Sequence, residues 1–153
     1  MEFTRARFLI LAGLILLVSC SSQKPIKSSP TSSSNGPASL VGTEWLLSDL
    51  AGTPVVPNSK ASLSFLESGR AAGNASCNRF TGAVTITGKA IKFGQMASTR
   101  MACVDADVSA QEDQYLKLLG TANRYDLTAN SLLIFVEGSD KPLRFSRQTS
   151  SQP

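Results

Sequence analysis

The chain has 153 residues, a length that predicts one domain, and a formal net charge of +4 without any histidine. The lack of histidine removes the commonest general base and the commonest zinc ligand. The positive charge does not indicate nucleic-acid binding. Four of the 15 basic residues precede residue 40, and the other 11 face 10 acidic residues and are scattered, whereas nucleic-acid binders gather basic residues on one face.

Residues 1–19 are predicted to be a lipoprotein signal peptide. Arg5 and Arg7 precede an apolar run over residues 8–18, which at about 1.5 Å per helical residue is too short for a hydrocarbon core of about 30 Å. A basic start, a short apolar run and small residues after it are typical of a secretory signal. The end of the run, Leu17-Val18-Ser19-Cys20, resembles a bacterial lipobox, which implies cleavage before Cys20 and acylation of that cysteine.

Residues 20–39 are expected to form a lipidated cysteine followed by a disordered tether. Serine and proline dominate this stretch, and such a composition cannot bury a core. Two or three acyl chains on Cys20 would bind a membrane stably. Ser21, and not aspartate, follows the cysteine. By resemblance to enterobacterial lipoproteins, this implies sorting to the outer membrane, with the domain facing the periplasm.

Residues 40–147 are predicted to form the globular domain, and residues 148–153 a frayed tail. Apolar residues alternate with polar ones in short runs separated by glycine, proline and asparagine turns, which is typical of antiparallel strands. The apolar run at 131–136 predicts a central strand covered on both faces. Strands are expected around residues 40–50, 61–66, 70–75, 83–87, 90–93, 124–128, 131–136 and 142–145, and residues 55–56 are expected to extend the partner of the first hairpin.

One helix is expected over residues 110–119. Ser109 and Glu112 have the spacing of a capping box, and Tyr115 and Leu119 recur at helical spacing. The predicted fold is therefore mainly β with one helix, an α+β arrangement. It is a small antiparallel cracked barrel or curled sheet of about seven to eight strands, packed by the helix. The expected interior residues are Trp45, Leu63, Phe65, Phe93 and Phe135.

An ordered set of short motifs resembles the META-domain (HslJ-like) family. The motifs are Gly42-Thr43-Glu44-Trp45-Leu46-Leu47, Cys77-Asn78-Arg79-Phe80-Thr81-Gly82, Thr99-Arg100-Met101-Ala102-Cys103, then Glu112 and Tyr115-Leu116. Two positions depart from the family pattern: Ser76 stands where glycine is common, and Ala83 where an aromatic residue is common. The resemblance implies a small antiparallel barrel with a helix, an envelope location and a link to heat or antibiotic stress. The family motif residues carried over are Trp45, Asn78, Phe80, Gly82, Thr99, Met101 and Ala102.

Three cysteines are present, at positions 20, 77 and 103. If Cys20 is acylated, only Cys77 and Cys103 remain to pair, and an exported protein meets oxidising conditions. A structural disulfide is expected. Two nearby reduced thiols and a redox-active pair are the alternatives, although the chain has no Cys-x-x-Cys motif and no histidine to activate a thiolate.

The polar residues of the two cysteine segments have open roles. Asn78 and Thr99 suit tight-turn hydrogen bonds. Arg79 and Arg100 either pair with a local aspartate, Asp105 or Asp107, or offer a binding spot for an anion or a partner. The Asp105-Ala106-Asp107 stretch lacks the spacing of an EF-hand loop, so no metal site is expected.

The favoured hypothesis is a non-catalytic envelope lipoprotein with a binding or stability role in stress, without a cofactor or catalytic residues. Its expected partners are the membrane, through the lipid anchor, and an envelope protein, and it is expected to be monomeric. The alternative is a carrier of a small apolar ligand or lipid in an open barrel, which requires a cavity. An enzyme would require a cleft with convergent titratable groups, and the sequence shows no such set.

Overall fold

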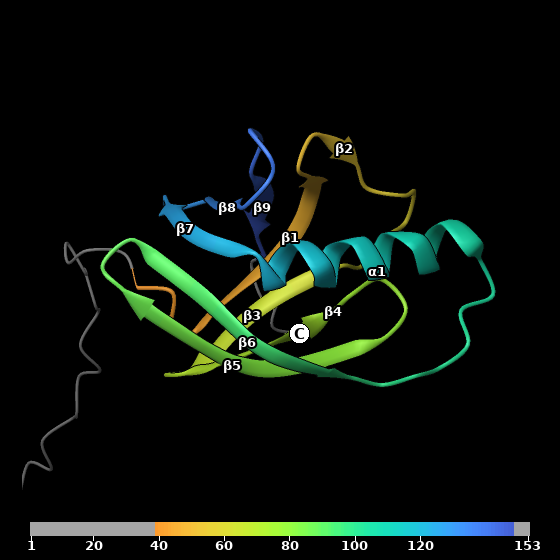
Figure 1. Cartoon of the computed structure of the whole chain (residues 1–153), viewed down its shortest axis with the longest axis horizontal. Coiled ribbons are helices and arrows are strands. Elements are labelled where there is room, and N and C mark those ends of the chain that lie inside the picture. The colour runs from red at the N-terminus through yellow and green to blue at the C-terminus, as the bar shows by residue number, and fades with distance from the viewer. Residues whose placement is uncertain (1–38, 149–153) are drawn as a thin grey trace, which may run out of the picture. The chain divides into compact units, whose positions relative to one another are not determined.

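The computed structural model describes residues 39–148 (Figure 1). The predicted signal peptide, Cys20 and nearly all of the predicted tether lie outside the described residues. The elements are β1 (Thr43–Leu50), β2 (Thr53–Pro54), β3 (Ser62–Glu67), β4 (Arg70–Asn74), β5 (Arg79–Thr87), β6 (Ala90–Ser98), α1 (Ala106–Gly120), β7 (Ala122–Leu127), β8 (Ser131–Val136) and β9 (Leu143–Arg147). Within the described residues, no helix has both the length and the apolar character needed to cross a bilayer.

Eight strands, β1 and β3 to β9, form a closed antiparallel barrel in chain order, and β1 pairs with β9 to seal it. The short β2 is an extra strand that pairs with the end of β1. Loop lengths explain this meander, because most neighbouring strands are joined by short turns such as the one at Gly88, which has a φ of 59°. The predicted small barrel with one helix is confirmed: the barrel has eight strands, within the seven to eight expected, and β2 is one more strand outside it.

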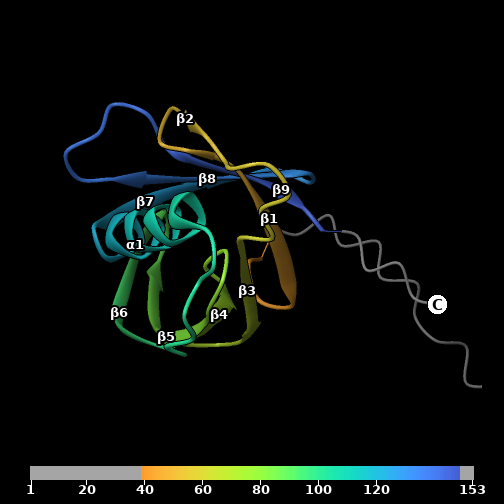
Figure 2. The same ribbon diagram turned by 90° about the vertical axis from the view of Figure 1, so that its right-hand side faces the viewer.

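The ladder between β6 and β7 is short. It contains one partner pair, Ala90 with Arg124, beside a hydrogen bond from the Tyr125 amide to the Lys89 carbonyl. Figures 1 and 2 show α1 lying between β6 and β7, where the two strands diverge. The helix therefore fills the part of the wall that the strands leave open.

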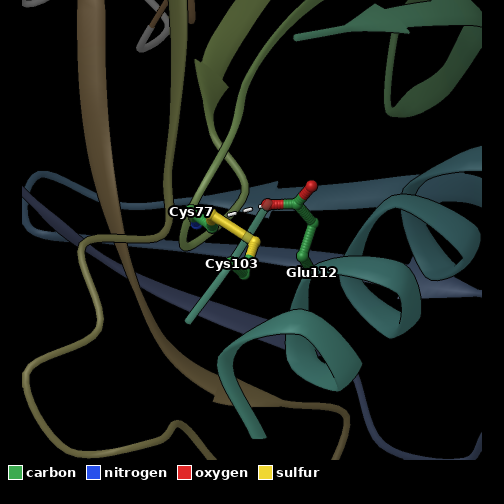
Figure 3. A group of neighbouring side chains, drawn as sticks. All are labelled: Cys77, Cys103 and Glu112. Carbon is green, nitrogen blue, oxygen red and sulfur yellow. Dashed lines mark hydrogen bonds between the residues drawn. A yellow bond between two sulfur atoms is a disulfide. The ribbon is translucent and has the colours of Figure 1, made fainter. Parts of the chain in front are cut away.

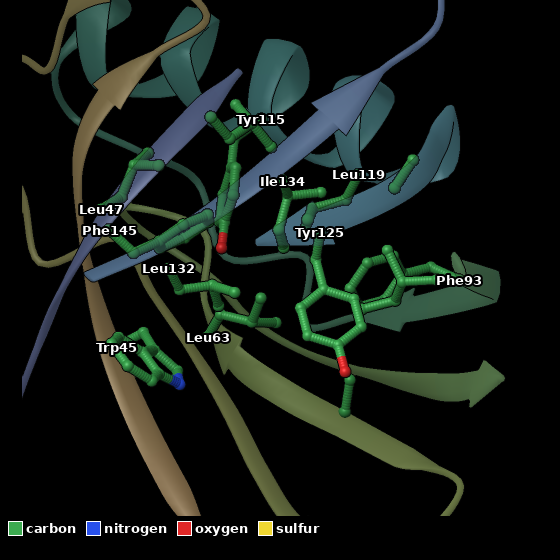
Figure 4. Close-up of a cluster of buried hydrophobic side chains, with 14 of the residues drawn as sticks. Trp45, Leu47, Leu63, Phe93, Tyr115, Leu119, Tyr125, Leu132, Ile134 and Phe145 are labelled. Atoms are coloured by element: carbon green, nitrogen blue, oxygen red, sulfur yellow. The ribbon is translucent and has the colours of Figure 1, made fainter. Parts of the chain in front are cut away.

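The barrel interior is filled by large apolar side chains from alternate strand positions (Figure 4). Each such side chain contributes about 1.5–3 kcal/mol by leaving water. Trp45 is fully buried, and its indole nitrogen donates to the Thr43 hydroxyl at 2.7 Å, so its predicted role as a core anchor is confirmed. The largest fully buried side chains are Trp45, Tyr115, Phe65, Phe145, Leu50, Leu63, Ile91, Leu119, Leu132, Ile134 and Leu143.

The helix starts four residues earlier than predicted, and its cap is a different residue. Asp105 is the N-cap, and its carboxylate accepts from the amides of Asp107 and Val108. Ser109 lies inside the helix, where its amide donates to the Asp105 carbonyl at 3.1 Å. The predicted capping box at Ser109 is wrong because Glu112 is turned toward another loop, as described below.

Several strand predictions also need correction. β5 begins at Arg79 and β6 continues to Ser98, so this hairpin is longer than the predicted pieces at 83–87 and 90–93. β2 is Thr53–Pro54 and does not include residues 55–56. The predicted tail begins at Gln148, but the amide of Gln148 donates to the Glu44 carbonyl in β1, so this residue is bound to the barrel. Residues 149–153 lie outside the described residues.

Strand β8 is covered on one face only. Its buried residues alternate with half-buried ones, and Phe135 lies on the half-buried face under the Arg124 guanidinium, 3.6 Å from the ring centroid. The predictions of a strand covered on both faces and of Phe135 in the barrel interior are therefore wrong. A cationic side chain shields this ring from water, which lets an aromatic residue occupy an outer position.

The two ends of the barrel are built differently. At the helix end, where β3 and β5 begin, Tyr115 of α1 packs edge-to-face on Phe80 with ring centroids 5.9 Å apart. At the open end, where β3 and β5 finish and β1 begins, no helix of residues 39–148 lies over the opening (Figure 1). The chemistry-bearing motifs gather at the helix end.

Candidate functional site: the clamped loops at the helix end

The first feature of the site is a disulfide between Cys77 and Cys103, whose Cα atoms are 6.0 Å apart (Figure 3). It joins the loop before β5 to the loop between β6 and α1, across a sequence separation of 26. Both cysteines are half-buried. The disulfide expected from the sequence is present, and it ties the start of the helix to the barrel wall.

Asn78 lies beside the disulfide and holds the second loop through its side chain. Its Oδ1 accepts from the Met101 amide at 2.8 Å and from the Thr99 hydroxyl at 3.0 Å. Its Nδ2 donates to the Met101 carbonyl at 3.3 Å. Thr99 in turn accepts from the Arg79 amide at 3.1 Å. The predicted turn-holding roles of Asn78 and Thr99 agree with these contacts.

Glu112 of α1 completes this network from the helix side. The residue is 8% exposed, and one carboxylate oxygen accepts from the amides of Asn78, at 2.7 Å, and Cys77, at 3.2 Å. The other oxygen accepts from the Asn78 Nδ2 at 2.8 Å. Backbone amides compensate a buried carboxylate for the loss of water. These three hydrogen bonds therefore satisfy the buried Glu112 carboxylate.

Gln111 makes a second buried contact set one residue earlier. Its side-chain oxygen accepts from the Val56 amide at 2.6 Å, and its nitrogen donates to the hydroxyls of Ser59 and Ser76. Ser76 has a φ of 122°, a region that strongly favours glycine. The hydroxyl contact with Gln111 accompanies this strained backbone, which explains how serine can stand where the family commonly has glycine.

The remaining motif residues pack the same end of the barrel. Phe80 is buried against Tyr115, whose hydroxyl donates to the Ser62 carbonyl at 3.2 Å. Burial raises the pKa of Tyr115 well above its ordinary value, so the hydroxyl remains a proton donor. A Cβ at Gly82 would lie 2.9 Å from the Met96 Cγ, because β5 and β6 approach closely at a bulge. Glycine at position 82 therefore has a packing reason.

Several side chains in and beside the two disulfide-linked loops, before β5 and between β6 and α1, point to solvent. Met101 and Val104 are 61% and 106% exposed, and Arg79 and Arg100 are also exposed. None of the ion pairs found among residues 39–148 involves either arginine, so the predicted pairing with Asp105 or Asp107 is not observed. Ala102 is exposed as well. Met101 enters the network through its backbone alone.

The donor atoms of Cys77, Cys103 and Glu112 lie within 4.8 Å of one another, a spacing that could suggest a metal ion. The two sulfur atoms are bonded to each other and are not thiolates. The Glu112 carboxylate already accepts three hydrogen bonds. The disulfide and these hydrogen bonds account for the cluster as a structural joint.

Residues 38–150 match the family model of the META domain. The chain belongs to the META-domain family. The match spans the barrel, the helix and both clamped loops, so the family resemblance found in the sequence motifs is confirmed. The comparison with curated protein sequences gives no match.

Solved structures share this META-domain fold. One NMR structure is 26% identical, with a TM-score of 0.57 over 70% of this chain and 90% of the other. A second, of a protein from Burkholderia xenovorans, is 24% identical, with a TM-score of 0.59 over 81% of this chain and 99% of the other. The second likeness supports the fold of the META domain alone.

Two residues of the site were missed or misassigned by sequence reasoning. Gln111 was not singled out, and Glu112 was assigned to a capping box. A signal for Glu112 exists, because it stands in the ordered META motif set together with Asn78. No local pattern in the sequence links Gln111 to Ser59 and Ser76, since these contacts cross 52 and 35 positions.

Proposed function

We propose that this META-domain protein is a bacterial envelope lipoprotein that binds a partner protein through the clamped loop over residues 99–104. Acylated Cys20 would anchor it in the outer membrane, with the domain in the periplasm. Its task there is non-catalytic, a binding or stability role in envelope stress caused by heat or antibiotics. The lipobox-like stretch at residues 17–20 and a disulfide suited to an oxidising compartment support this location.

The binding role is supported by one observation: the backbone of this loop is held in place while several of its side chains are exposed to solvent. Asn78 and the disulfide hold the loop at Met101 and Cys103, while Met101 and Val104 expose apolar surface. A loop that is ordered before binding loses little conformational freedom when a partner arrives. Methionine and arginine are also enriched in protein interfaces. Arg79 and Arg100 are exposed and take part in no ion pair among residues 39–148, so both are available to acidic groups of a partner.

A non-catalytic role agrees with the state of the titratable groups at the site. Glu112 is occupied by three donors, and Tyr115 is fully buried with its hydroxyl on Ser62. The central interior offers no support for the alternative of a ligand carrier, because Trp45, Leu63 and Phe65 fill it.

The binding role can be tested in cells with a photocrosslinking amino acid at Met101 of the full-length chain. We expect one envelope protein to be captured in stoichiometric amount, and Arg79→Glu with Arg100→Glu to reduce the capture. The matched control carries the same crosslinker at Asp140, an exposed turn position. Equal capture from both positions, or none from Met101, would contradict the proposal.

The anchor can be tested separately by labelling cells with radioactive palmitate. We expect the label on the wild-type chain and its loss in Cys20→Ser. Outer-membrane fractionation of the wild type should follow the label. Release of the unmutated chain into the soluble periplasm would contradict the proposed anchor.

A further inference from the structure

The open end of the barrel contains a pocket of about 370 Å³. Small-molecule sites usually enclose roughly 300–1,000 Å³. The floor of this pocket consists of buried apolar side chains from three separate strands or their flanks, Leu40, Phe65 and Val84. Its size and its floor suit a short hydrocarbon group.

Tyr125 supplies a polar group to this apolar floor. The residue is 9% exposed and lines the pocket, and its hydroxyl lies on the side of the ring away from Leu119 and Ile134 (Figure 4). The hydrogen bonds found among residues 39–148 include none to this hydroxyl, whereas the Tyr115 hydroxyl bonds to Ser62. Among the described residues, no side-chain oxygen or nitrogen is both fully buried and without a hydrogen bond, so the Tyr125 hydroxyl is reached by water. It is therefore available to a ligand that displaces this water from the pocket.

The mouth of the pocket combines apolar with polar side chains, among them Ser39, Ser68 and Thr85, and carries one charged residue. Val41 and Ile86 are exposed there, at 47% and 37%. Glu67 is the charged residue of the lining among the described residues, and Arg70, 3.2 Å from its carboxylate, lies outside the lining. No lysine or arginine of the described residues lines the pocket, and Lys89, which lies 5.8 Å from the Tyr125 ring centroid, is paired with Asp126. A ligand carrying a carboxylate or phosphate would therefore meet Glu67 and no unpaired cation.

We propose that this pocket binds an uncharged single-chain amphiphile, such as a monoacyl ester. Its hydrocarbon chain would lie on Phe65 and Val84 between Val41 and Ile86, and its ester oxygen would accept from the Tyr125 hydroxyl. This site lies at the opposite end of the β5–β6 hairpin from the clamped loop, so it does not depend on the proposed partner binding.

Fluorine NMR on the full-length processed chain in lipid nanodiscs tests the site directly, because the chain has two tyrosines. With 3-fluorotyrosine incorporated, 1-octanoylglycerol should shift the Tyr125 resonance saturably. The Tyr115 resonance, which reports the helix end, should stay unchanged and serves as the internal control. The absence of any Tyr125 response up to the solubility limit of the ester would overturn the proposal.

Variants measured by equilibrium dialysis, with empty nanodiscs as the blank, separate the contacts. Ile86→Arg at the mouth should weaken binding of the octanoyl ester at least tenfold. Tyr125→Phe should weaken it about three- to tenfold, as expected for one lost hydrogen bond. Ala97→Arg, exposed near the other end of the same hairpin, should bind as the wild type does. Unaltered binding by Ile86→Arg would show that the ester binds elsewhere.

A separate comparison tests the preference of the pocket for an uncharged ligand. Octanoate should bind more weakly than the uncharged ester, and Glu67→Gln should narrow that difference by strengthening octanoate binding alone. If octanoate binds the wild type as tightly as the ester, the assignment of an uncharged ligand is wrong. Crosslinking at Met101 is read separately, so either proposal can fail without the other.

Discussion

The two ends of the barrel differ in how their polar groups are satisfied. At the helix end, buried polar side chains such as Gln111, Glu112 and Asn78 bond to one another and to backbone groups. At the open end, the Tyr125 hydroxyl has no such partner within the described part of the chain. At the helix end the buried polar groups are therefore satisfied within the protein, whereas at the open end the Tyr125 hydroxyl is left to water or to a ligand. The following substitutions test this difference.

Removal of the disulfide should produce the largest effect. Cys77→Ala with Cys103→Ala should lower the free energy of unfolding by roughly 3.5 kcal/mol, because the unfolded chain regains the freedom of the closed loop. Urea unfolding measures the change, and reductant should destabilise the wild type by a similar amount. Alkylation that labels both cysteines in an oxidised wild-type preparation would show that the joint lacks this bond.

Glu112→Ala should cost about 3 kcal/mol, because it leaves buried amide donors of Cys77 and Asn78 without acceptors. Glu112→Gln should cost less, since its side-chain oxygen can still accept. Asp113→Ala, exposed on the same helix, is the matched control and should change stability by less than about 0.5 kcal/mol. If Glu112→Ala and Asp113→Ala lose the same free energy of unfolding, the hydrogen bonds of Glu112 do not stabilise the two loops as described.

The two tyrosines compare the ends with the same chemical change. Tyr115→Phe should cost about 1 kcal/mol of unfolding free energy through the lost bond to Ser62. Tyr125→Phe should leave stability unchanged without ligand, because its hydroxyl bonds to no described group. Thermal unfolding of both variants measures the difference. A loss at Tyr125 as large as that at Tyr115 would mean that the open end is also a closed polar network.

Substitution of Ser76 by glycine should change the free energy of unfolding least, because relief of backbone strain and loss of a hydrogen bond oppose each other. Ser76→Gly relieves the backbone at a φ of 122° but loses the contact with Gln111, so stability should change by less than about 0.5 kcal/mol. Ser76→Ala loses the contact and keeps the strain, so it should cost about 1 kcal/mol. Urea unfolding separates the two. Equal values for both variants would contradict the strain at this position.

The fold was largely predictable because its signals are local. Alternation in β1 and β3 and the turn residues between strands predict the hairpins, and the ordered motifs predict the family. The start of α1 was not predictable from Ser109 and Glu112, because a buried acceptor role for Glu112 competes with capping. The donors that decide it lie more than 30 positions away.

The candidate site was predictable in its members and only partly in its contacts. Parity of the cysteines predicts the pairing of Cys77 with Cys103, and turn chemistry predicts Asn78. The alternation of buried and half-buried residues in β8 could not be recognised in the sequence, because apolar residues stand on both faces of the strand. Phe135 can occupy the outer face because the Arg124 guanidinium covers its ring. The free hydroxyl of Tyr125 has no sequence signal, since it is defined by the absence of a neighbour in three dimensions.

The pairing of β1 with β9 has a consequence for the order of folding. Residues at the two ends of the domain meet there: the Ser48 hydroxyl bonds to the Arg144 carbonyl across 96 positions, and the Arg147 guanidinium lies 4.7 Å from the Trp45 ring centroid. Contacts of such long range form late, after the intervening chain has been ordered. A chain that is still being synthesised cannot seal its barrel until the last strand is free. Until then β1 and β8 present open edges, the state in which such a protein is most exposed to aggregation.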